Sequence, residues 1–189
     1  MLTFKATYEH KAEINYRNKF GKYLPKKVSV VRLDPDNPDD ITAIKTISET
    51  WKADKNIAKD IAEDMQLYPR QKHIFKDKYF YAITTQAKTF LHLNPEKVLG
   101  IAELTEKNEG FNYIDFIQVN PAYTNNTINR QFKHIGEALI KTLINAANCS
   151  KIYLNSLPHA VKFYLKQGFV MKVADISDPL MLLVKTIKK

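Results

Sequence analysis

The chain has 189 residues, 44% of them hydrophobic, which is enough to bury the core of one domain with at most a short appendage. This composition excludes an intrinsically disordered chain, and the single cysteine, Cys149, excludes an intrachain disulfide or a cysteine-rich metal site. The sequence contains no apolar run of the about 18 residues that a membrane span requires, and from its first residues we expect no signal peptide. We therefore expect a cytoplasmic protein with no metal and no membrane partner.

The formal net charge of +9 favours anionic partners but does not choose among them. Lysine spread over a solvated surface is the simplest explanation, because the basic residues are scattered and form no arginine-rich run. A nucleic acid or a phosphate-bearing ligand would use the same charge, since both are bound by neutralising phosphates. Nucleic acid is the less favoured of these partners, and a homodimer is left open.

Residues 1–27 show no single pattern, and a hairpin, a short helix or an arm packed on the domain would each be compatible with them. We treat them as an N-terminal extension of unclear structure and residues 28–189 as a single domain. Valines and a following turn-rich segment predict a strand at 27–33. Isoleucines at spacings of three and four then predict helices at about 39–51 and 55–67.

The second half of the chain alternates strands and helices. Strands are predicted at 79–85, 97–105 and about 114–119. After a polar loop, a helix is predicted from one apolar face, formed by Phe132, Ile135, Ala138, Leu139, Thr142, Leu143 and Ala146. The remaining predicted elements are a strand at 151–154, a helix between Pro158 and Gly168, and strands at 170–176 and 180–187.

This half of the chain contains two short motifs, which are separated by a predicted helix and a predicted strand. The first joins a strand end at 119–121, Val-Asn-Pro, to Gln131 and Gly136 at the start of the helix. The second is the segment 160–169, which reads AVKFYLKQGF. Together they resemble the acetyl-CoA loop and the later tyrosine-bearing helix of the GNAT superfamily of N-acetyltransferases. His134 departs from the family pattern, because a glycine is usual at its position.

The resemblance implies an α+β fold with a mixed, mostly antiparallel central sheet, flanked by helices and splayed in the middle to hold the cofactor. It implies acetyl-CoA as co-substrate, with pantetheine on the main chain of Ile117 and Val119 and pyrophosphate at the helix start, where unpaired N–H groups favour an anion. The implied cofactor-binding residues are Ile117, Gln118, Val119, Gln131, Phe132, Lys133, His134, Ile135, Gly136, Glu137, Ala138, Asn155 and Tyr164. We expect His134 to be helical with its ring turned outward, because a helical position needs no positive φ.

The resemblance also places Tyr164 beside the thioester sulfur, where its phenol would protonate the departing thiolate. A core aromatic on the same helix is the alternative. Asp115 or Glu103 is expected to accept the proton of the amine, with an ion-paired or solvated role as the alternative for each. Asp115 precedes Ile117 and Val119 by two and four residues, so we expect it on the same face of the strand.

These motifs predict an N-acetyltransferase that transfers the acetyl group of acetyl-CoA to a primary amine of a small molecule, peptide or protein by direct attack in a ternary complex. Two alternatives stay open. The histidine at the glycine position would suit a catalytically inactive GNAT-fold module with a binding or regulatory role. The basic charge would suit a toxin-type acetyltransferase that acts on aminoacyl-tRNA.

Overall fold

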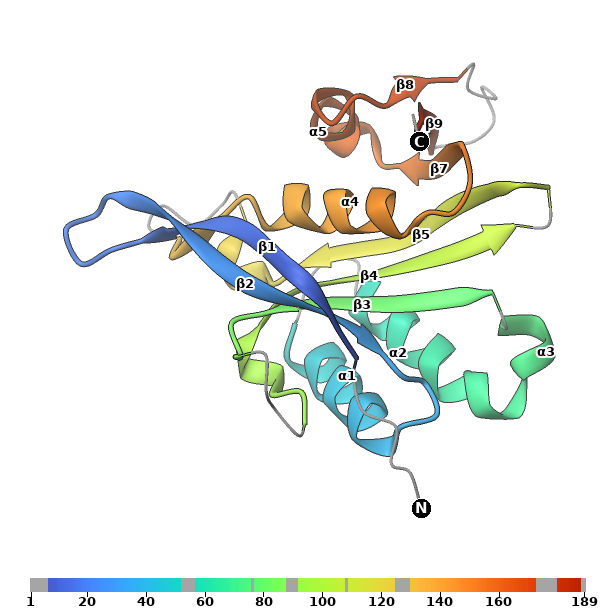
Figure 1. Cartoon of the computed structure of the whole chain (residues 1–189), viewed down its shortest axis with the longest axis horizontal. Helices are drawn as coiled ribbons and strands as arrows, with labels where there is room; N and C mark the ends of the chain where they lie inside the picture. The colour runs from blue at the N-terminus through green and yellow to red at the C-terminus, as the bar shows by residue number, and fades with distance from the viewer. Residues whose placement is uncertain are drawn as a thin grey trace.

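In the computed structural model, nine strands of the described residues form one sheet in the order β6-β1-β2-β3-β4-β5-β7-β9-β8. Figure 1 shows most of these strands with the helices around them. The structure describes residues 7–51, 57–75, 77–87, 92–107, 109–124, 130–172 and 180–187. The strands are β1 (Thr7–Arg17), β2 (Tyr23–Leu33), β3 (Lys78–Thr84), β4 (Val98–Lys107), β5 (Phe111–Val119), β6 (Phe132–Lys133), β7 (Lys151–Ser156), β8 (Val170–Met171) and β9 (Met181–Thr186). The helices are α1 (Pro38–Thr50), α2 (Ile57–Leu67), α3 (Lys72–Phe75), α4 (Ile135–Ala146) and α5 (Val161–Lys166). The β5–β7 pair is parallel and the other strand pairs in these ranges are antiparallel, which confirms the predicted mixed, mostly antiparallel fold.

The first two strands form a long hairpin that turns through Gly21, whose φ of +80° is one that a glycine adopts without strain. Of the structures that the sequence leaves open for residues 1–27, the described part is therefore a hairpin, and β2 runs through residue 28 without interruption. Ile14 of β1 and Val30 of β2 are buried in the same cluster as α4, so the hairpin contributes to the core. Figure 1 shows its closed end reaching beyond the neighbouring strands.

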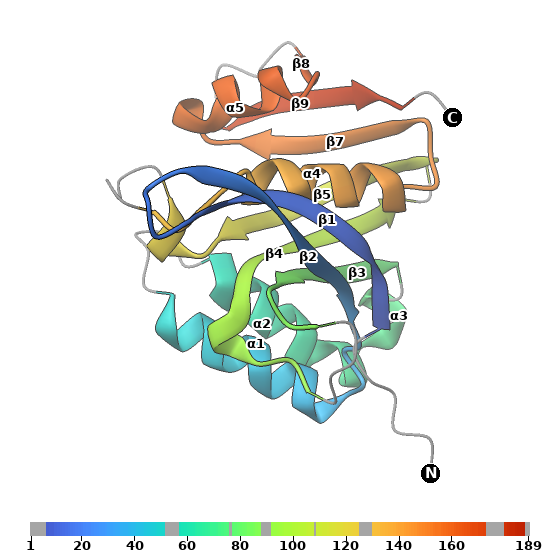
Figure 2. The same ribbon diagram turned by 60° about the vertical axis from the view of Figure 1, so that its left-hand side comes forward.

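Helices cover both faces of the sheet (Figure 2). One face, which we call the α2 face, is covered by α1 and α2. Ile44 and Ile47 of α1 and Ile61 and Met65 of α2 are buried there against Phe80 of β3. The predicted periodicity of these two helices is confirmed, although residues 55 and 56 of the second lie outside the described ranges.

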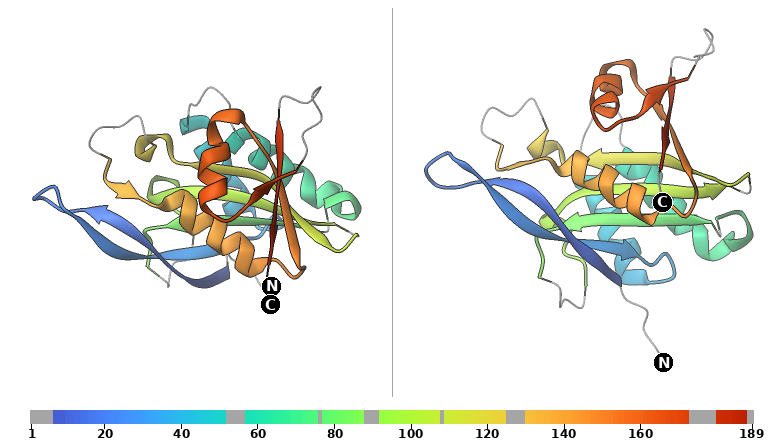
Figure 3. Two further views of the ribbon diagram at one scale, coloured as in Figure 1. Left: turned by 90° about the horizontal axis from the view of Figure 1, so that it is seen from above. Right: turned by 45° about the horizontal axis from the view of Figure 1, so that its top comes forward.

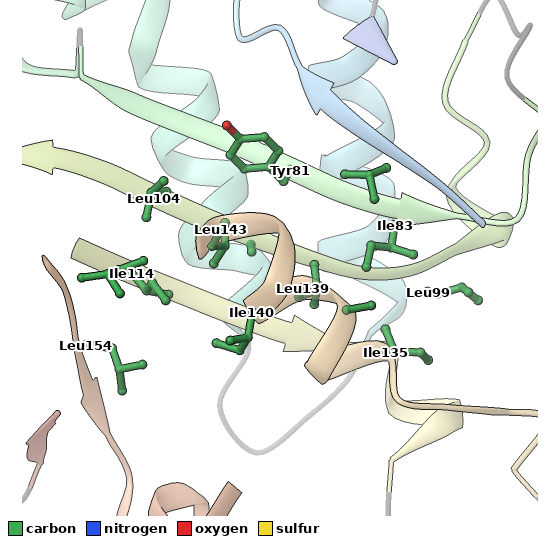
Figure 4. Close-up of a cluster of buried hydrophobic side chains, with 14 of the residues drawn as sticks. Tyr81, Ile83, Leu99, Leu104, Ile114, Ile135, Leu139, Ile140, Leu143 and Leu154 are labelled. Carbon is green, nitrogen blue, oxygen red and sulfur yellow. The ribbon is translucent and has the colours of Figure 1, made fainter. Parts of the chain in front are cut away.

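The opposite face, which we call the α4 face, is covered by α4 and α5. Leu139 and Leu143 of α4 lie over the sheet beside Leu104 and Ile114 (Figure 4). Gly100 of β4 permits this close approach, since a Cβ there would lie 2.8 Å from Leu139 Cδ1. The apolar face predicted for this helix therefore packs on the centre of the sheet.

The sheet opens between β5 and β7. Their parallel pairing stops at Ile114 and Leu154, although β5 continues to Val119 and β7 to Ser156. The last residues of β5 thus have no strand partner on that side among the described residues. This opening is the splay that the sequence predicts for the middle of the sheet.

A β-bulge lies where this opening begins. Glu103 of β4 pairs with Phe116 and the next residue, Leu104, pairs with Ile114, so Asp115 has no Cα partner on β4. A bulge inserts one residue into a strand and locally disturbs the alternation of its side chains. The direction in which Asp115 points therefore depends on the bulge and not on simple spacing.

Two element boundaries differ from the sequence prediction. Phe132 and Lys133 form the short strand β6 against β1, so α4 begins at Ile135 and not at the first residue of its predicted apolar face. At the other end of the chain, β8 ends at Met171, and residues 173–176 of the strand predicted at 170–176 lie outside the described ranges. The last strand, β9, pairs with both β7 and β8. Figure 3 shows the β1–β2 hairpin and the β8–β9 pair at opposite edges of the sheet.

Candidate active site

A cavity of about 510 Å³ opens on the α4 face, where the end of β5, the start of α4 and one side of α5 meet. Its basic lining residues are Arg130, Lys133, His134, His159, Lys162 and Lys166. Glu137 is the only acid among the described residues that line it. We call it the basic cavity. Its charge suits an anion that carries more than one phosphate.

The start of α4 supplies this cavity with main-chain donors. The first hydrogen bond within the helix is donated by Ala138 N to the carbonyl of His134, at 3.0 Å. The N–H groups of Ile135, Gly136 and Glu137 therefore have no partner inside the helix, and the side chain of His134 does not cap them. These groups and the helix dipole together favour an anion at this end of the cavity.

His134 stands immediately before α4 in the left-handed conformation, with φ +66° and ψ 19°. The expectation of a helical conformation is therefore wrong, because the chain must turn sharply between β6 and α4. A residue with a Cβ adopts this conformation at a cost of about 1–2 kcal/mol, which explains why a glycine is usual here. The imidazole Nδ1 contacts the carboxylate of Glu137, so the one acid among the described lining residues has a partner.

Gly136 allows α5 to lie directly on the first turn of α4. A Cβ at this position would lie 3.2 Å from Phe163 Cζ and 3.7 Å from Val119 Cγ2. The end of β5, the start of α4 and α5 therefore meet around one glycine. The two motifs that are separated in the sequence come together in the fold.

Several residues predicted to bind the cofactor have buried side chains. Phe132 is 5% exposed, with its ring packed on those of Tyr16 and Tyr123 at centroid distances of 5.6 and 5.0 Å. Ile135 and Ala138 are buried in the core of the α4 face. At these positions the main chain could meet a ligand, whereas the side chains hold the loop and the helix to the sheet.

Two other loop residues connect the site to the hairpin. Gln131 is exposed, and its carbonyl accepts a hydrogen bond of 2.8 Å from Arg17 N of β1. Lys133 lines the basic cavity, and its Nζ lies 3.7 Å from the ring centroid of Tyr23 on β2. The hairpin therefore supports one rim of the cavity.

The predicted residues of the strands point in different directions. Ile117 and Val119 pack on the core of the α4 face. The side chain of Gln118 instead caps the start of α2, because its Oε1 accepts a hydrogen bond of 2.5 Å from Ala58 N. Asn155 is exposed on β7 and lies outside the described lining of the basic cavity. Gln118 can therefore offer a ligand only its main chain.

Tyr164 lies on α5 between two other rings, with centroids 5.0 Å from that of Phe163 and 5.9 Å from that of Phe169. Burial raises the pKa of its phenol to about 12, so the group is protonated at neutral pH. Phe163 and Lys162 line the basic cavity, and Tyr164 itself does not. Its partly buried ring packs against the core of the α4 face.

A cluster of charged and polar groups lies on the α2 face. Glu103 is completely buried, and its carboxylate contacts the Nζ of Lys78, which also binds Asp64 of α2 at 2.5 Å. Burial raises the pKa of Glu103 to about 8. Thr105 donates a hydrogen bond of 2.5 Å to Asp115, whose pKa is also raised by burial. Both candidate proton acceptors are therefore more basic than ordinary carboxylates.

Asp115 does not share a face with Ile117 and Val119, and the expectation based on its spacing is wrong. The bulge reverses the alternation of β5, so Asp115 and Phe116 both point toward the α2 face. The two acids thus lie together on one face and the basic cavity lies on the other. The sheet lies between the acids and the cavity, and the gap between β5 and β7 opens next to Asp115.

Several residues of the basic cavity are not among those predicted from the sequence. Lys162 and Lys166 stand one helical turn apart on α5, and this spacing alone would have placed them on one face. Arg130 and Tyr123 lie on either side of a polar loop, where no periodicity reveals which way a side chain points. The basic residues of the cavity therefore come from two separate segments, 130–134 and 159–166.

Within the described ranges, no three His, Cys, Asp or Glu side chains gather into a group that could hold a metal ion. The helices of those ranges are all too short or too polar to cross a membrane. Cys149 is half-buried beside Asn148, whose Oδ1 accepts a 3.0 Å hydrogen bond from the thiol. The thiol therefore lies away from the lining of the basic cavity.

Comparison with known proteins agrees with this geometry. Residues 71–184, more than half of the chain, match the family described as acetyltransferase (GNAT) domain. The chain therefore belongs to the GNAT acetyltransferase family, and its class is that of an acyltransferase. No protein of curated function matches the sequence.

Solved structures share the fold over most of the chain. An acetyltransferase from Streptococcus agalactiae 2603 has a TM-score of 0.53 and 17% identity, over 84% of this chain and 98% of that one. PaiA N-acetyltransferase from Thermoplasma acidophilum, in complex with coenzyme A, has a TM-score of 0.52 and 15% identity, over 85% and 99%. Ard1 from Thermoplasma volcanium has a TM-score of 0.52 and 13% identity, over 86% and 99%. At these identities the likeness shows the fold.

Proposed function

We propose that the protein is an N-acetyltransferase that transfers the acetyl group of acetyl-CoA to a primary amine by direct attack within a ternary complex. The observation that carries this proposal is the meeting of the β5 end, the uncapped start of α4 and α5 around one basic cavity. The complex of the structurally similar PaiA with coenzyme A supports the choice of cofactor.

The residues of the basic cavity fit the phosphates of coenzyme A. Three main-chain N–H groups at the start of α4 would bind the pyrophosphate, as the dipole of the helix favours. Lys133, Lys162 and Lys166 would neutralise the remaining phosphate charge. The open edge of β5 from Ile117 to Val119 would pair with the amides of the pantetheine arm, in the manner of an added strand.

Transfer requires that the amine lose a proton, that its nitrogen form a bond to the acetyl carbon, and that the carbon–sulfur bond break. Asp115 is the candidate proton acceptor, because it lies at the opening between β5 and β7 and burial makes its carboxylate more basic. Glu103 is bound by Lys78, so its role is to hold that cation in the cluster beside Asp115. Tyr164 is the candidate donor to the departing thiolate, since its phenol is protonated at neutral pH.

Calorimetric titration with acetyl-CoA, followed by an assay of free thiol with a panel of primary amines, tests the proposal. Binding together with amine-dependent thiol release supports it. Binding without thiol release from any amine would favour the catalytically inactive module. Absence of binding removes the proposal.

The role of Tyr164 is tested by Tyr164→Phe, which removes only the hydroxyl group. We expect kcat to fall at least about tenfold while the dissociation constant of acetyl-CoA stays the same, because the ring continues to pack on Phe163 and Phe169. Tyr68→Phe, at a half-buried tyrosine outside the cavity lining, is the matched control. An unchanged kcat in Tyr164→Phe would show that the phenol is not the acid.

The hairpin favours a second candidate acceptor, an aminoacyl-tRNA. Its closed end, residues 17–27, contains five basic residues and no acid. Phe20 is 75% exposed there, and Lys19 Nζ lies 5.1 Å from its ring centroid. Exposed rings among cations are typical of surfaces that bind single-stranded nucleic acid. Salt-dependent tRNA binding that weakens in Phe20→Ala would support this acceptor, and no binding at low salt would exclude it.

A further inference from the structure

A second cavity, of about 470 Å³, lies on the α2 face, away from the basic cavity. Its described lining consists of Lys107, Phe111, Tyr113, Asp115, Tyr153 and Leu182. We call it the aromatic cavity. Its side chains come from β4, β5, β7 and β9, and they point away from the α4 face because their neighbours Ile114, Leu154 and Leu183 are buried there.

The walls of the aromatic cavity are apolar. The rings of Phe111 and Tyr153 meet edge to face with centroids 4.9 Å apart, and each is only half-buried. Tyr113 lies between Phe111 and Asp115 on the same strand, and Leu182 completes the wall from β9. Rings of this kind bind a flat or linear apolar group well, since they offer large contact area with little loss of freedom.

The charges of this cavity stand at opposite ends. Asp115 lies next to the last paired residues of β5 and β7, so its carboxylate is at the end nearest the gap. Lys107 pairs with Phe111 at the far end of β5, with its Nζ 5.9 Å from the centroid of Tyr113. If a ligand placed an ammonium at Asp115, the rest of the ligand would lie along the apolar wall. Its far end would then approach the cation of Lys107.

We propose that the aromatic cavity binds the acetyl acceptor, and that this acceptor is a primary alkylamine with an apolar, ring-sized far end and no second cationic group. This inference rests on the proposed function. Asp115 would hold the ammonium at the gap between β5 and β7, across which the thioester would be presented from the α4 face. Lys107 would disfavour a polyamine, whose next ammonium would approach a like charge.

The reaction in this arrangement balances without a further reactant. The ammonium gives one proton to Asp115, the neutral nitrogen bonds to the acetyl carbon, and the carbon–sulfur bond breaks with its electron pair on sulfur. The nitrogen then loses its second proton, and the thiolate takes up one proton to leave as the free thiol. One net proton passes from Asp115 to solvent.

Two primary amines with similar numbers of heavy atoms test the choice of acceptor. With the full chain and saturating acetyl-CoA, we expect kcat/KM for 2-phenylethylamine to exceed that for spermidine at least about tenfold, because burial of an apolar group and avoidance of a like charge both favour the former. Spermidine as the better substrate, or equal values for the two, would overturn the inference.

Leu182→Lys tests the cavity itself, because it adds a cation to the apolar wall. We expect KM for 2-phenylethylamine to rise at least about tenfold while the dissociation constant of acetyl-CoA stays within about twofold. Leu67→Lys, at an exposed leucine on α2, is the matched control and should change neither value. An unchanged KM in Leu182→Lys would overturn the inference even if the enzyme is active.

A binding experiment separates failure of this inference from failure of the proposed function. Saturation-transfer NMR with 2-phenylethylamine should show contact in the wild-type protein and lose it in Leu182→Lys, whether or not acetyl transfer is seen. If acetyl-CoA does not bind, the proposed function fails. If acetyl-CoA binds but 2-phenylethylamine neither contacts the protein nor is acetylated, the inference alone is wrong.

Discussion

The two cavities lie on opposite faces of the same sheet and are built from different parts of the chain. The basic cavity depends on main-chain N–H groups at the start of α4 and on cations at its rim. The aromatic cavity depends on side chains, with Asp115 turned toward it by a bulge in β5. A site built from backbone tolerates many side-chain changes, whereas a site built from side chains depends on each of them. The two cavities should therefore respond differently to substitution.

The sharpest contrast is expected from Asp115→Asn. This change removes the proposed proton acceptor but keeps the size of the side chain, so we expect kcat to fall about 100-fold at neutral pH. The dissociation constant of acetyl-CoA should not change, because Asp115 points away from the basic cavity. Steady-state kinetics and calorimetry measure the two effects separately.

A matched control for that change is Asp60→Asn, at an exposed acid on α2. The difference in kcat between the wild-type protein and Asp115→Asn should also become smaller at alkaline pH, because the amine there loses its proton to solvent without a protein acceptor. A similar loss of rate in both variants, or a deficit that stays constant with pH, would contradict the role of Asp115 as proton acceptor.

The next largest effect is expected from removing two cations of the basic cavity. The double variant Lys162→Ala with Lys166→Ala should weaken acetyl-CoA binding about tenfold at low salt, because both side chains line the cavity that we propose binds the phosphates. The loss should shrink as the salt concentration rises, since these lysines are exposed. Titration calorimetry at two ionic strengths measures it.

Lys45→Ala with Lys59→Ala removes the same charge from exposed positions on α1 and α2 and serves as the control. This control variant should leave the affinity for acetyl-CoA nearly unchanged. Equal weakening in both double variants would mean that net charge, and not the basic cavity, determines binding.

The difference between the cavities also explains what the sequence could predict. The regular apolar spacing of α1, α2 and α4 determines which face each helix buries, so these helices and the α+β fold were predictable. The start of α4 was recognisable because main-chain sites leave a short motif around Gly136. The resemblance supplied that motif, since spacing alone would not have distinguished it from an ordinary helix start.

The parts that could not be predicted depend on interactions between distant segments. The bulge that turns Asp115 arises from how β4 and β5 pair, and alternation within β5 alone predicts the wrong face. Phe132 and Lys133 read as the start of a helix, yet they pair with β1 more than 110 residues earlier in the chain. The left-handed conformation of His134 follows from that pairing, because the chain must turn there to enter α4.

The buried cluster beside Asp115 should give stability a characteristic pH dependence. The folded protein keeps a proton on Glu103 up to about pH 8, whereas the unfolded chain releases it near 4.5. The unfolding free energy should therefore fall as pH rises between these values, because the unfolded state binds fewer protons there. Asp40, whose pKa burial raises to about 6, contributes to the lower part of this window.

Denaturant unfolding of two variants separates these contributions. Glu103→Gln should flatten the pH dependence between about pH 6 and 8, and Asp40→Asn should flatten it only below about pH 6. A wild-type stability that rises with pH between 6 and 8 would contradict the raised pKa of Glu103.

The smallest effect is expected at His134, and it tests whether the basic cavity depends on backbone. His134→Gly and His134→Ala both remove the contact with Glu137, but only glycine adopts a φ of +66° without strain. The glycine variant should therefore exceed the alanine variant by about 1 kcal/mol in unfolding free energy, as measured with denaturant. Equal stabilities would show that the left-handed conformation carries no cost.

The affinity of these two variants for acetyl-CoA extends the same test. If the cavity binds phosphate through the N–H groups of Ile135, Gly136 and Glu137, the imidazole is dispensable, and the dissociation constant should change less than in the double lysine variant. A loss as large as that of the lysine pair would mean that the histidine side chain itself holds the phosphate. The basic cavity would then depend on a side chain in the same way as the aromatic cavity depends on Asp115.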